Sequence, residues 1–241
     1  MKLLPIIGFD RYVPRHWLDL ALAIAAGQRE PTDLARLLAS EITGIEARSK
    51  TMIIINRMWL APHPSLVDYS ARGVHLHSLH TNQDLLPLHW GMAVRSHPFF
   101  ATLVDCIGRL LRLHGEFTSA QVTRRLKEQY GDRASILRAS EAVLQTLQQW
   151  SAIRLIDPKA RKFAQGVILD VSDTGRVLWL LEAALFATGK SMPVTKSANQ
   201  LFPLRLRLPS EADVKRAGRL RLSVTGTGEL VVSVPQVNSA Q

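Results

Sequence analysis

The sequence is poor in cysteine and has no long apolar run. Cys106 is the only cysteine among 241 residues, which excludes an internal disulfide and a zinc site built from several cysteines. No stretch of about 18 uncharged apolar residues occurs, so we expect no membrane-spanning helix. The apolar stretch after Lys2 is interrupted by Pro5 and Asp10 and is too short for a signal peptide. We therefore expect a cytoplasmic protein with no membrane partner.

The sequence also lacks the short motifs that mark common catalytic sites. It contains no phosphate-binding loop, no dinucleotide-binding glycine pattern and no nucleophile elbow. Cys106 falls among apolar residues at helical spacing, which favours a buried thiol over a nucleophile. The spacing of His75, His77 and His80 matches no closed zinc motif. We therefore predict neither an enzyme nor a bound metal or cofactor.

Acidic residues are too few to balance the basic ones. Thirty Lys and Arg side chains face 20 Asp and Glu side chains, which gives a net charge of +10. Residues 1–98 carry 10 basic and 8 acidic side chains, residues 99–175 carry 11 and 8, and residues 176–241 carry 9 and 4. A basic surface of this size attracts polyanions, among them nucleic acid, membrane surfaces and ribosomes.

Residues 1–98 are predicted to form a helical domain. A segment over 16–26 is rich in Leu and Ala and is followed by Gly27, a plausible C-terminal cap. Thr32 is placed to cap a second helix. A third helix over 45–60 is favoured, although its central apolar run would equally suit a buried strand.

The segment 61–98 differs in composition from what precedes it. It holds four of the 12 prolines and six of the eight histidines. This composition predicts a loop or linker, followed by a short helix over 88–94. Pro98 marks the expected boundary with the next domain.

The first part of segment 99–175 predicts three helices. Apolar residues recur at helical spacing from Phe99, and this helix is expected to end before Gly115. Thr118 and Gln121 have the form of a capping box, in which two side chains satisfy each other's backbone donors at a helix start. A second helix should follow them, and a short turn should lead into a third.

Two β-like runs, 153–156 and 167–171, follow the third helix, which we expect over 134–150. A turn-rich basic tip over 157–162 joins the two runs. Three helices followed by two strands and a basic connecting loop is the order of a winged helix-turn-helix. Residues 99–175 resemble that class of domain.

In a winged helix-turn-helix the third helix enters the major groove of DNA, and the wing contacts phosphate or the minor groove. Arg and Gln side chains can pair with base edges, while basic side chains elsewhere neutralise phosphates. Glu141 lies on the same helix face and would repel phosphate. The predicted contacts are Arg124 and Arg125 on the second helix, Arg133, Ser135, Arg138 and Gln145 on the third, and Lys159, Arg161 and Lys162 on the wing.

The last segment, 176–241, is predicted to hold an apolar helix and a small α+β domain. Arg and Leu alternate strictly over 204–208 and 219–222, which is typical of strands with one apolar face. Ser210 is placed to cap a short helix between these strands. If the strands pair, their arginines share a face that could hold a nucleic-acid backbone or an acidic partner. These arginines are Arg205, Arg207, Arg219 and Arg221.

Two further segments carry a family resemblance. Basic residues over 48–57 run into Trp59, and a small-apolar-His-Pro turn over 93–100 precedes the helix-turn-helix region. In this organisation the chain resembles the small A subunit of BREX-type bacteriophage-exclusion systems. The resemblance implies a non-enzymatic binder of double-stranded DNA that works beside a methyltransferase, an ATPase and other defence proteins. It assigns a role to no residue.

The expected fold is mainly α with small β elements: a helical N-terminal domain, a winged helix-turn-helix and a small C-terminal α+β domain. The expected function is double-stranded DNA binding without catalysis, as an accessory subunit of a bacterial phage-defence assembly. One alternative is a homodimeric winged-helix transcriptional regulator, in which the apolar helix over 177–186 pairs with its mate. Another is a scaffold that grips an acidic protein.

Overall fold

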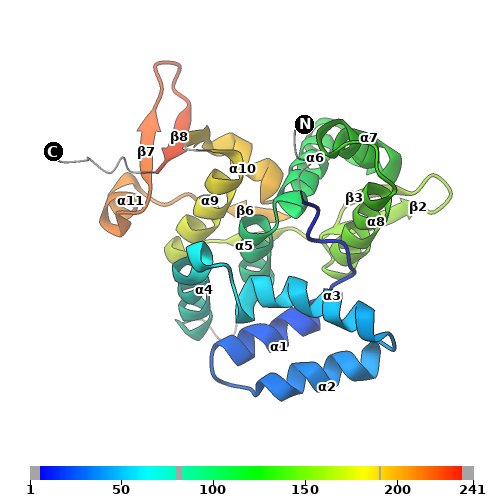
Figure 1. Cartoon of the computed structure of the whole chain (residues 1–241). Coiled ribbons are helices and arrows are strands. Elements are labelled where there is room, and N and C mark those ends of the chain that lie inside the picture. The colour runs from blue at the N-terminus through cyan, green and yellow to red at the C-terminus, as the bar shows by residue number, and fades with distance from the viewer. Residues whose placement is uncertain (1–5, 80–82, 190, 235–241) are drawn as a thin grey trace, which may run out of the picture.

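The computed structural model describes residues 6–79, 83–189 and 191–234. Within these ranges the chain is mainly helical and carries three small β-sheets (Figure 1). The prediction of a mainly α fold with small β elements is therefore confirmed. None of the helices in these ranges has both the length and the apolar character needed to cross a bilayer.

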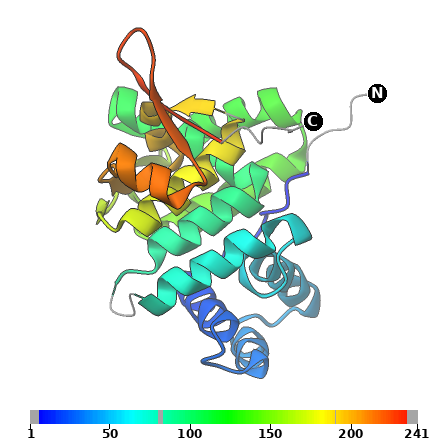
Figure 2. The ribbon, with the colours of Figure 1, turned by 90° about the vertical axis from the view of Figure 1, so that its left-hand side faces the viewer.

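Three N-terminal helices form a layer at the bottom of Figures 1 and 2. They are α1 (Arg15–Ala25), α2 (Pro31–Glu41) and α3 (Ile45–Ile55), and α3 continues into the π-helical turn η1 (Asn56–Leu60). The helix expected over 45–60 is thus correct, and the strand alternative is wrong. The cap predicted at Thr32 is also wrong, because α2 begins at Pro31. Glu30 and Asp33 form its capping box instead.

The loop predicted after residue 60 is wrong over most of its length. A single 3-10 turn, η2 (Pro64–Leu66), leads into α4 (Val67–Leu79), and α5 (Leu86–Ser96) follows. Three of the four prolines that suggested a loop, Pro64, Pro87 and Pro98, lie at helix starts, where a missing N–H costs nothing. Gly73 and Leu76 lie on the buried face of α4, so one side of this helix faces the core. The proline and histidine content of the segment gave no sign of that face.

Helices α5 and α9 (Thr174–Thr188) pack tightly against each other. Trp179 of α9 lies against two glycines, and a Cβ added to Gly91 would stand 2.1 Å from its Cζ3 atom. Trp179 also stacks on Tyr69 with 4.4 Å between ring centroids and donates its indole N–H to the Tyr69 carbonyl at 3.0 Å. Glycine at position 91 is therefore required for the two helices to approach this closely.

One hydrophobic cluster includes residues from all three predicted segments. Val177, Leu180, Leu181 and Leu185 of α9 are fully buried within it. These four side chains of the helix that the dimer hypothesis assigned to pairing are thus covered inside one chain, whereas Phe186 is 47% exposed. The division at Pro98 and residue 175 stays a prediction, because the core continues across both positions.

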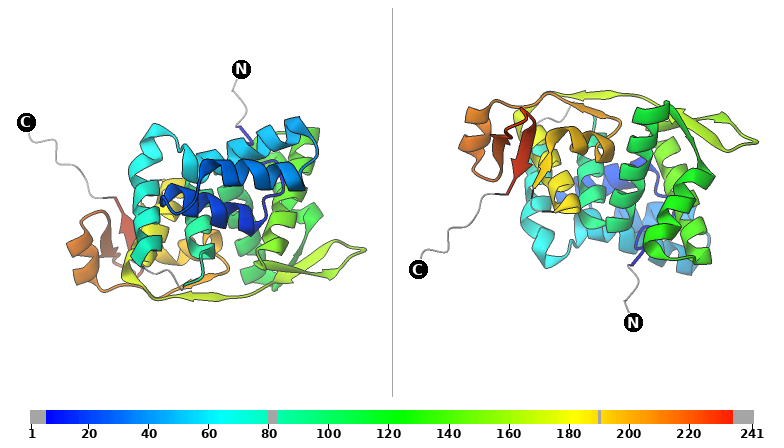
Figure 3. Two further views of the ribbon diagram at one scale, coloured as in Figure 1. Left: turned by 90° about the horizontal axis from the view of Figure 1, so that it is seen from below. Right: turned by 90° about the horizontal axis from the view of Figure 1, so that it is seen from above.

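Three helices and three short strands follow α5. They are α6 (Pro98–His114), β1 (Glu116–Thr118), α7 (Ser119–Tyr130), α8 (Ala134–Gln149), β2 (Ile153–Asp157) and β3 (Lys162–Gln165). The strands form an antiparallel sheet in the order β1-β3-β2, and Phe117 pairs with Phe163 across it with 5.3 Å between ring centroids. Both views in Figure 3 show the β2–β3 hairpin projecting from the body.

The capping box at the start of α7 is confirmed. The Gln121 backbone N–H donates to Thr118 Oγ1 at 3.3 Å, and the Thr118 N–H donates to Gln121 Oε1 at 2.7 Å. The second strand of the hairpin is misplaced in the sequence analysis, since it is 162–165 and not 167–171. The later run forms a different strand, because its partner lies much further along the chain.

Two small sheets hold the C-terminal segment. Their elements are β4 (Leu169–Val171), β5 (Ser191–Pro193), α10 (Val194–Gln200), β6 (Leu204–Leu206), α11 (Glu211–Ala217), β7 (Arg221–Val224) and β8 (Leu230–Ser233). Strand β6 pairs in parallel with β4. Strand β8 lies between β5 and β7, pairs antiparallel with both, and is joined to β7 by a tight turn. The conditional pairing of 204–208 with 219–222 is therefore wrong. A hairpin partner a few residues away costs less chain entropy than a distant strand.

Candidate nucleic-acid interface

The exposed side of α8 and the β2–β3 hairpin together form what we call the α8–wing surface. On α8, buried Ile136, Ala139 and Val143 face the core. Arg138 and Gln145 lie two helical turns apart on the opposite, exposed face. The members of this surface are Arg133, Ser135, Leu137, Arg138, Glu141 and Gln145 of α8 and its preceding turn, with Arg154, Lys159, Arg161 and Lys162 of the hairpin.

The predicted residues on α8 differ in how far they are exposed. Arg138 and Gln145 are exposed, whereas Arg133 and Ser135 are half-buried at the start of the helix. Sequence analysis missed Leu137, whose side chain is 49% exposed beside Arg138. An apolar side chain at such a position can contact a thymine methyl group.

The C-terminal end of α8 is occupied by the N-terminal segment of the chain. The Val13 N–H donates to Thr146 Oγ1 at 3.0 Å, and the Trp150 indole N–H donates to the Val13 carbonyl at 3.0 Å. The Arg15 N–H donates to Gln149 Oε1 at 2.8 Å. These contacts restrict any approach by a ligand to the part of α8 that precedes Thr146.

An ion pair links the hairpin to α8. Arg161 Nη1 lies 3.7 Å from Glu141 Oε1, so the carboxylate that was expected to repel phosphate on this helix face lies against a guanidinium. Lys162 Nζ lies 2.8 Å from Glu116 Oε1, and this hydrogen bond raises the pKa of Lys162. Two of the three predicted wing cations thus have a carboxylate partner within the protein.

Lys159 and Arg154 are exposed and have no ion-pair partner among the described residues. Lys159 lies at the tip of the hairpin, where Asp157 Oδ1 accepts its backbone N–H at 2.9 Å. Arg154 is not among the predicted contacts, although its position in a strand next to the basic tip could have identified it.

The structure separates the two arginines predicted on the second helix. Arg124 is exposed and has no ion pair within the described ranges. Arg125, one position further along α7, lines a groove bounded by α6, α7 and α10. Consecutive helix positions differ by about 100° in direction, so the two side chains lie on different surfaces of the protein.

The four tail arginines do not share one sheet face. Arg205 Nη1 lies 3.6 Å from Asp170 Oδ1 on the neighbouring strand β4. Arg219 makes two hydrogen bonds to Asp68 of α4, at 2.9 and 3.2 Å. Arg207, just after β6, and Arg221, at the start of β7, are both exposed. The predicted arginine-lined face is therefore wrong, because Arg205 and Arg221 lie in strands of different sheets and Arg207 and Arg219 lie outside the strands.

The histidines do not assemble a metal site in the described ranges, where no group of three or more His, Cys, Asp or Glu side chains is suited to hold an ion. His75 and His77 lie on a helix rather than a strand, so they point in different directions. His80 lies outside the described residues. Burial raises the pKa of the Cys106 thiol to about 11, which disfavours the nucleophilic thiolate.

The α8–wing surface thus combines two exposed groups able to read base edges with two exposed cations able to neutralise phosphates. This arrangement suits the binding of a polyanion. Comparison with family models, with curated proteins and with solved structures gave no match to this chain.

Proposed function

We propose that residues 98–165 form a winged helix-turn-helix and that this cytoplasmic protein binds double-stranded DNA through the α8–wing surface, without catalysis. The observation that carries the proposal is the pairing of Arg138 and Gln145 on the exposed face of α8 with a projecting hairpin that bears Lys159 and Arg154. The element order and the β1-β3-β2 sheet match those of winged helices, whose third helix enters the major groove.

The ion pair between Arg161 and Glu141 supports the proposal by removing an objection to it. An isolated carboxylate on the reading face would repel phosphate. Paired with Arg161, Glu141 instead fixes the hairpin against the helix and leaves the local charge near neutral. Replacing it by Glu141→Gln would release Arg161, and duplex affinity should rise for all sequences.

The test is a fluorescence titration of a labelled duplex with wild-type protein and single-residue variants. Arg138→Ala should weaken binding at preferred sites by about 1–3 kcal/mol and relax discrimination between sites, as expected for a base contact. Lys215→Ala on α11 is the matched control, since it removes an exposed cation at the opposite end of the molecule from the hairpin (Figure 1). Equal losses in both variants would contradict the assigned surface.

The family resemblance extends the proposal to an accessory DNA-binding subunit of a bacterial phage-defence assembly. Its support is the organisation of the sequence and the basic charge of the chain. A plaque assay in cells that carry the assembly tests this step. Arg138→Ala should lose protection while the protein accumulates normally, and full protection by that variant would contradict it.

An acidic protein is the second candidate partner, and one observation favours a protein. Leu155, Ile156 and Val167 expose apolar side chains on or beside the hairpin, at 43%, 38% and 53% exposure. Exposed apolar groups of this kind commonly mark protein contacts. Failure of the duplex titration at low salt, together with a partner whose binding is lost in Leu155→Glu, would favour this role over DNA binding.

A further inference from the structure

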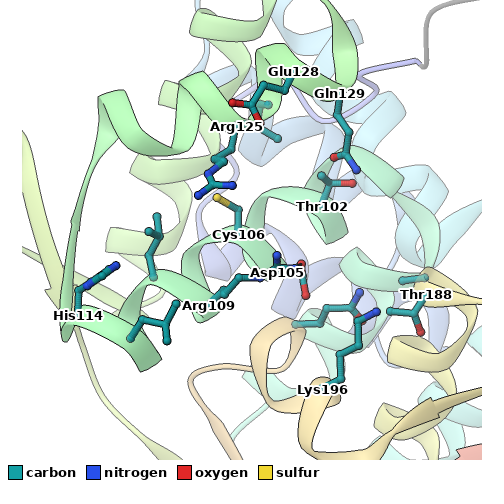
Figure 4. Close-up of a pocket in the computed structure, with 15 residues that line it drawn as sticks. Thr102, Asp105, Cys106, Arg109, His114, Arg125, Glu128, Gln129, Thr188 and Lys196 are labelled. Atoms are coloured by element: carbon teal, nitrogen blue, oxygen red, sulfur yellow. Dashed lines mark hydrogen bonds and ion pairs between the residues drawn. The ribbon is translucent and has the colours of Figure 1, made fainter.

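A groove with a volume of about 490 Å³ lies between α6, α7 and the C-terminal helices α9 and α10 (Figure 4). This volume falls within the range of roughly 300–1,000 Å³ that is typical of small-molecule sites. His114 lies at one end and Thr188 and Lys196 lie at the other, with Asp105 and Arg125 between them (Figure 4). The groove is separate from the α8–wing surface.

Cations from three different helices converge on this groove. Arg125 of α7 and Lys196 of α10 have no ion-pair partner among the described residues, whereas Arg109 of α6 is held 2.8 Å from Asp105 Oδ2. Glu128 is the other carboxylate on the rim. Arg125 and Lys196 therefore offer charged donors to an anionic group placed between α7 and α10.

Two of the residues that line the groove carry oxygen acceptors that lack donors. Asp105 Oδ1 and Gln200 Oε1 are buried and have no hydrogen-bond partner in the described part of the chain. The Gln200 residue is only 4% exposed. Terminal carboxylate and carboxamide torsions are broad, so each oxygen can turn toward a hydroxyl or amine group that enters the groove. A ligand that fits must therefore carry hydrogen-bond donors as well as negative charge.

The end near His114 has a different character. Leu110 and Leu113 line it, and the Leu113 side chain is 64% exposed. Apolar side chains beside an exposed imidazole ring suit a flat heterocycle. The groove is thus apolar at this end and carries acceptors and cations together in its middle and at the end near Lys196. A nucleoside phosphate offers the matching groups, which are an apolar base, donor hydroxyls and an anion.

We propose that this groove binds a nucleoside phosphate. The base lies against Leu113 and His114, the ribose hydroxyls donate to Asp105 and Gln200, and the phosphate lies between Arg125 and Lys196. Acidic side chains accept ribose hydroxyls in the same manner in dinucleotide sites. The proposal does not depend on DNA binding by the α8–wing surface.

Isothermal titration of the full chain with AMP tests the proposal, with adenosine and inorganic phosphate as separate arms. AMP should bind saturably and at least about tenfold more tightly than either part alone. Arg125→Gln and Lys196→Gln should each lower AMP affinity about tenfold, because each removes a charge-assisted hydrogen bond. Arg124→Gln and Lys215→Gln are the matched controls and should leave AMP affinity unchanged.

Several outcomes would overturn the proposal. These are the absence of saturable AMP binding, equal binding of inorganic phosphate and AMP, or full AMP affinity in both Arg125→Gln and Lys196→Gln. Displacement of AMP by a DNA duplex would also overturn it, because the groove would then hold backbone phosphate. Loss of duplex binding in Arg138→Ala with AMP binding retained would instead show that the two sites are independent.

Discussion

Lowering the pH from 7 to 5 should destabilise the fold through His97, which lies at the junction of α5 and α6. Its ring is buried and packs edge-on against Phe9, with 5.2 Å between ring centroids. Burial, and then the charge of Arg57, lower the pKa of His97 to about 3. The folded protein therefore keeps this side chain neutral where an unfolded chain would charge it.

Hydrogen bonds explain why the ring resists a second proton. Ser96 Oγ donates to the Met92 carbonyl at 2.5 Å and so accepts from His97 Nδ1 at 2.8 Å. The other nitrogen, Nε2, then carries no hydrogen, and it is buried without a partner among the described residues. Protonation would bury a charged N–H with no acceptor, which lowers the pKa.

The magnitude follows from the two pKa values. Between about pH 6.5 and pH 3 the unfolded chain binds a proton at His97 that the folded protein does not bind. The free energy of unfolding therefore decreases as the pH is lowered through this window, by about 1.4 kcal/mol per pH unit. From pH 7 to pH 5 the loss is about 2 kcal/mol, out of a total that is typically about 5–15 kcal/mol. His89, whose pKa is also lowered by burial, adds a loss of the same sign.

Urea unfolding at pH 7 and pH 5, followed by tryptophan fluorescence, measures this loss. His97→Phe keeps a ring against Phe9 and removes the titrating group. Between pH 7 and pH 5 this variant should therefore lose about 2 kcal/mol less unfolding free energy than the wild type. His114→Phe is the control, because His114 is exposed. Equal pH dependence in wild type and His97→Phe would refute the reasoning.

Two further changes test the packing of α9. Gly91→Ala places a Cβ 2.1 Å from the Trp179 ring and should cost about 3 kcal/mol or more, seen as a lower Tm in calorimetry, while Gly226→Ala has open space and should change little. Glu182→Leu removes the more buried of the two carboxylates that pair with Arg72, whose Nη2 lies 2.7 Å from Glu182 Oε1 and whose Nε lies 3.1 Å from Asp68 Oδ2, and should cost about 2 kcal/mol in urea unfolding. The double variant with Arg72→Met should recover part of that loss. An unchanged Tm in Gly91→Ala, or additive losses in the double variant, would contradict this packing.

Local signals in the sequence predicted local structure well. The capping box at Thr118 and the cap at Ser210 are both confirmed, because each depends on residues a few positions apart. Composition over 61–98 misled the prediction. Three of its four prolines mark helix starts rather than a loop, and the buried face of α4 includes Gly73, which a count of apolar residues ignores.

The candidate site was only partly predictable, because some of its features depend on local sequence and others on contacts between distant elements. The exposed positions of Arg138 and Gln145 follow from helical periodicity, which the sequence carries. The Arg161–Glu141 ion pair and the turn of Arg125 into the groove depend on how α7, α8 and the hairpin meet. The parallel pairing of β4 with β6 likewise joins strands separated by α9, so alternation alone could not identify the partner.

The salt dependence of duplex binding tests the central claim most directly. Wild-type affinity should fall linearly on a log–log plot against salt concentration, and the slope should become shallower by about 1.8 in the double variant Arg154→Ala plus Lys159→Ala, which removes two phosphate contacts. Lys215→Ala plus Arg216→Ala, on α11, should leave the slope unchanged. A flat salt dependence, or equal slopes in the wild type and the hairpin variant, would contradict DNA binding by the α8–wing surface.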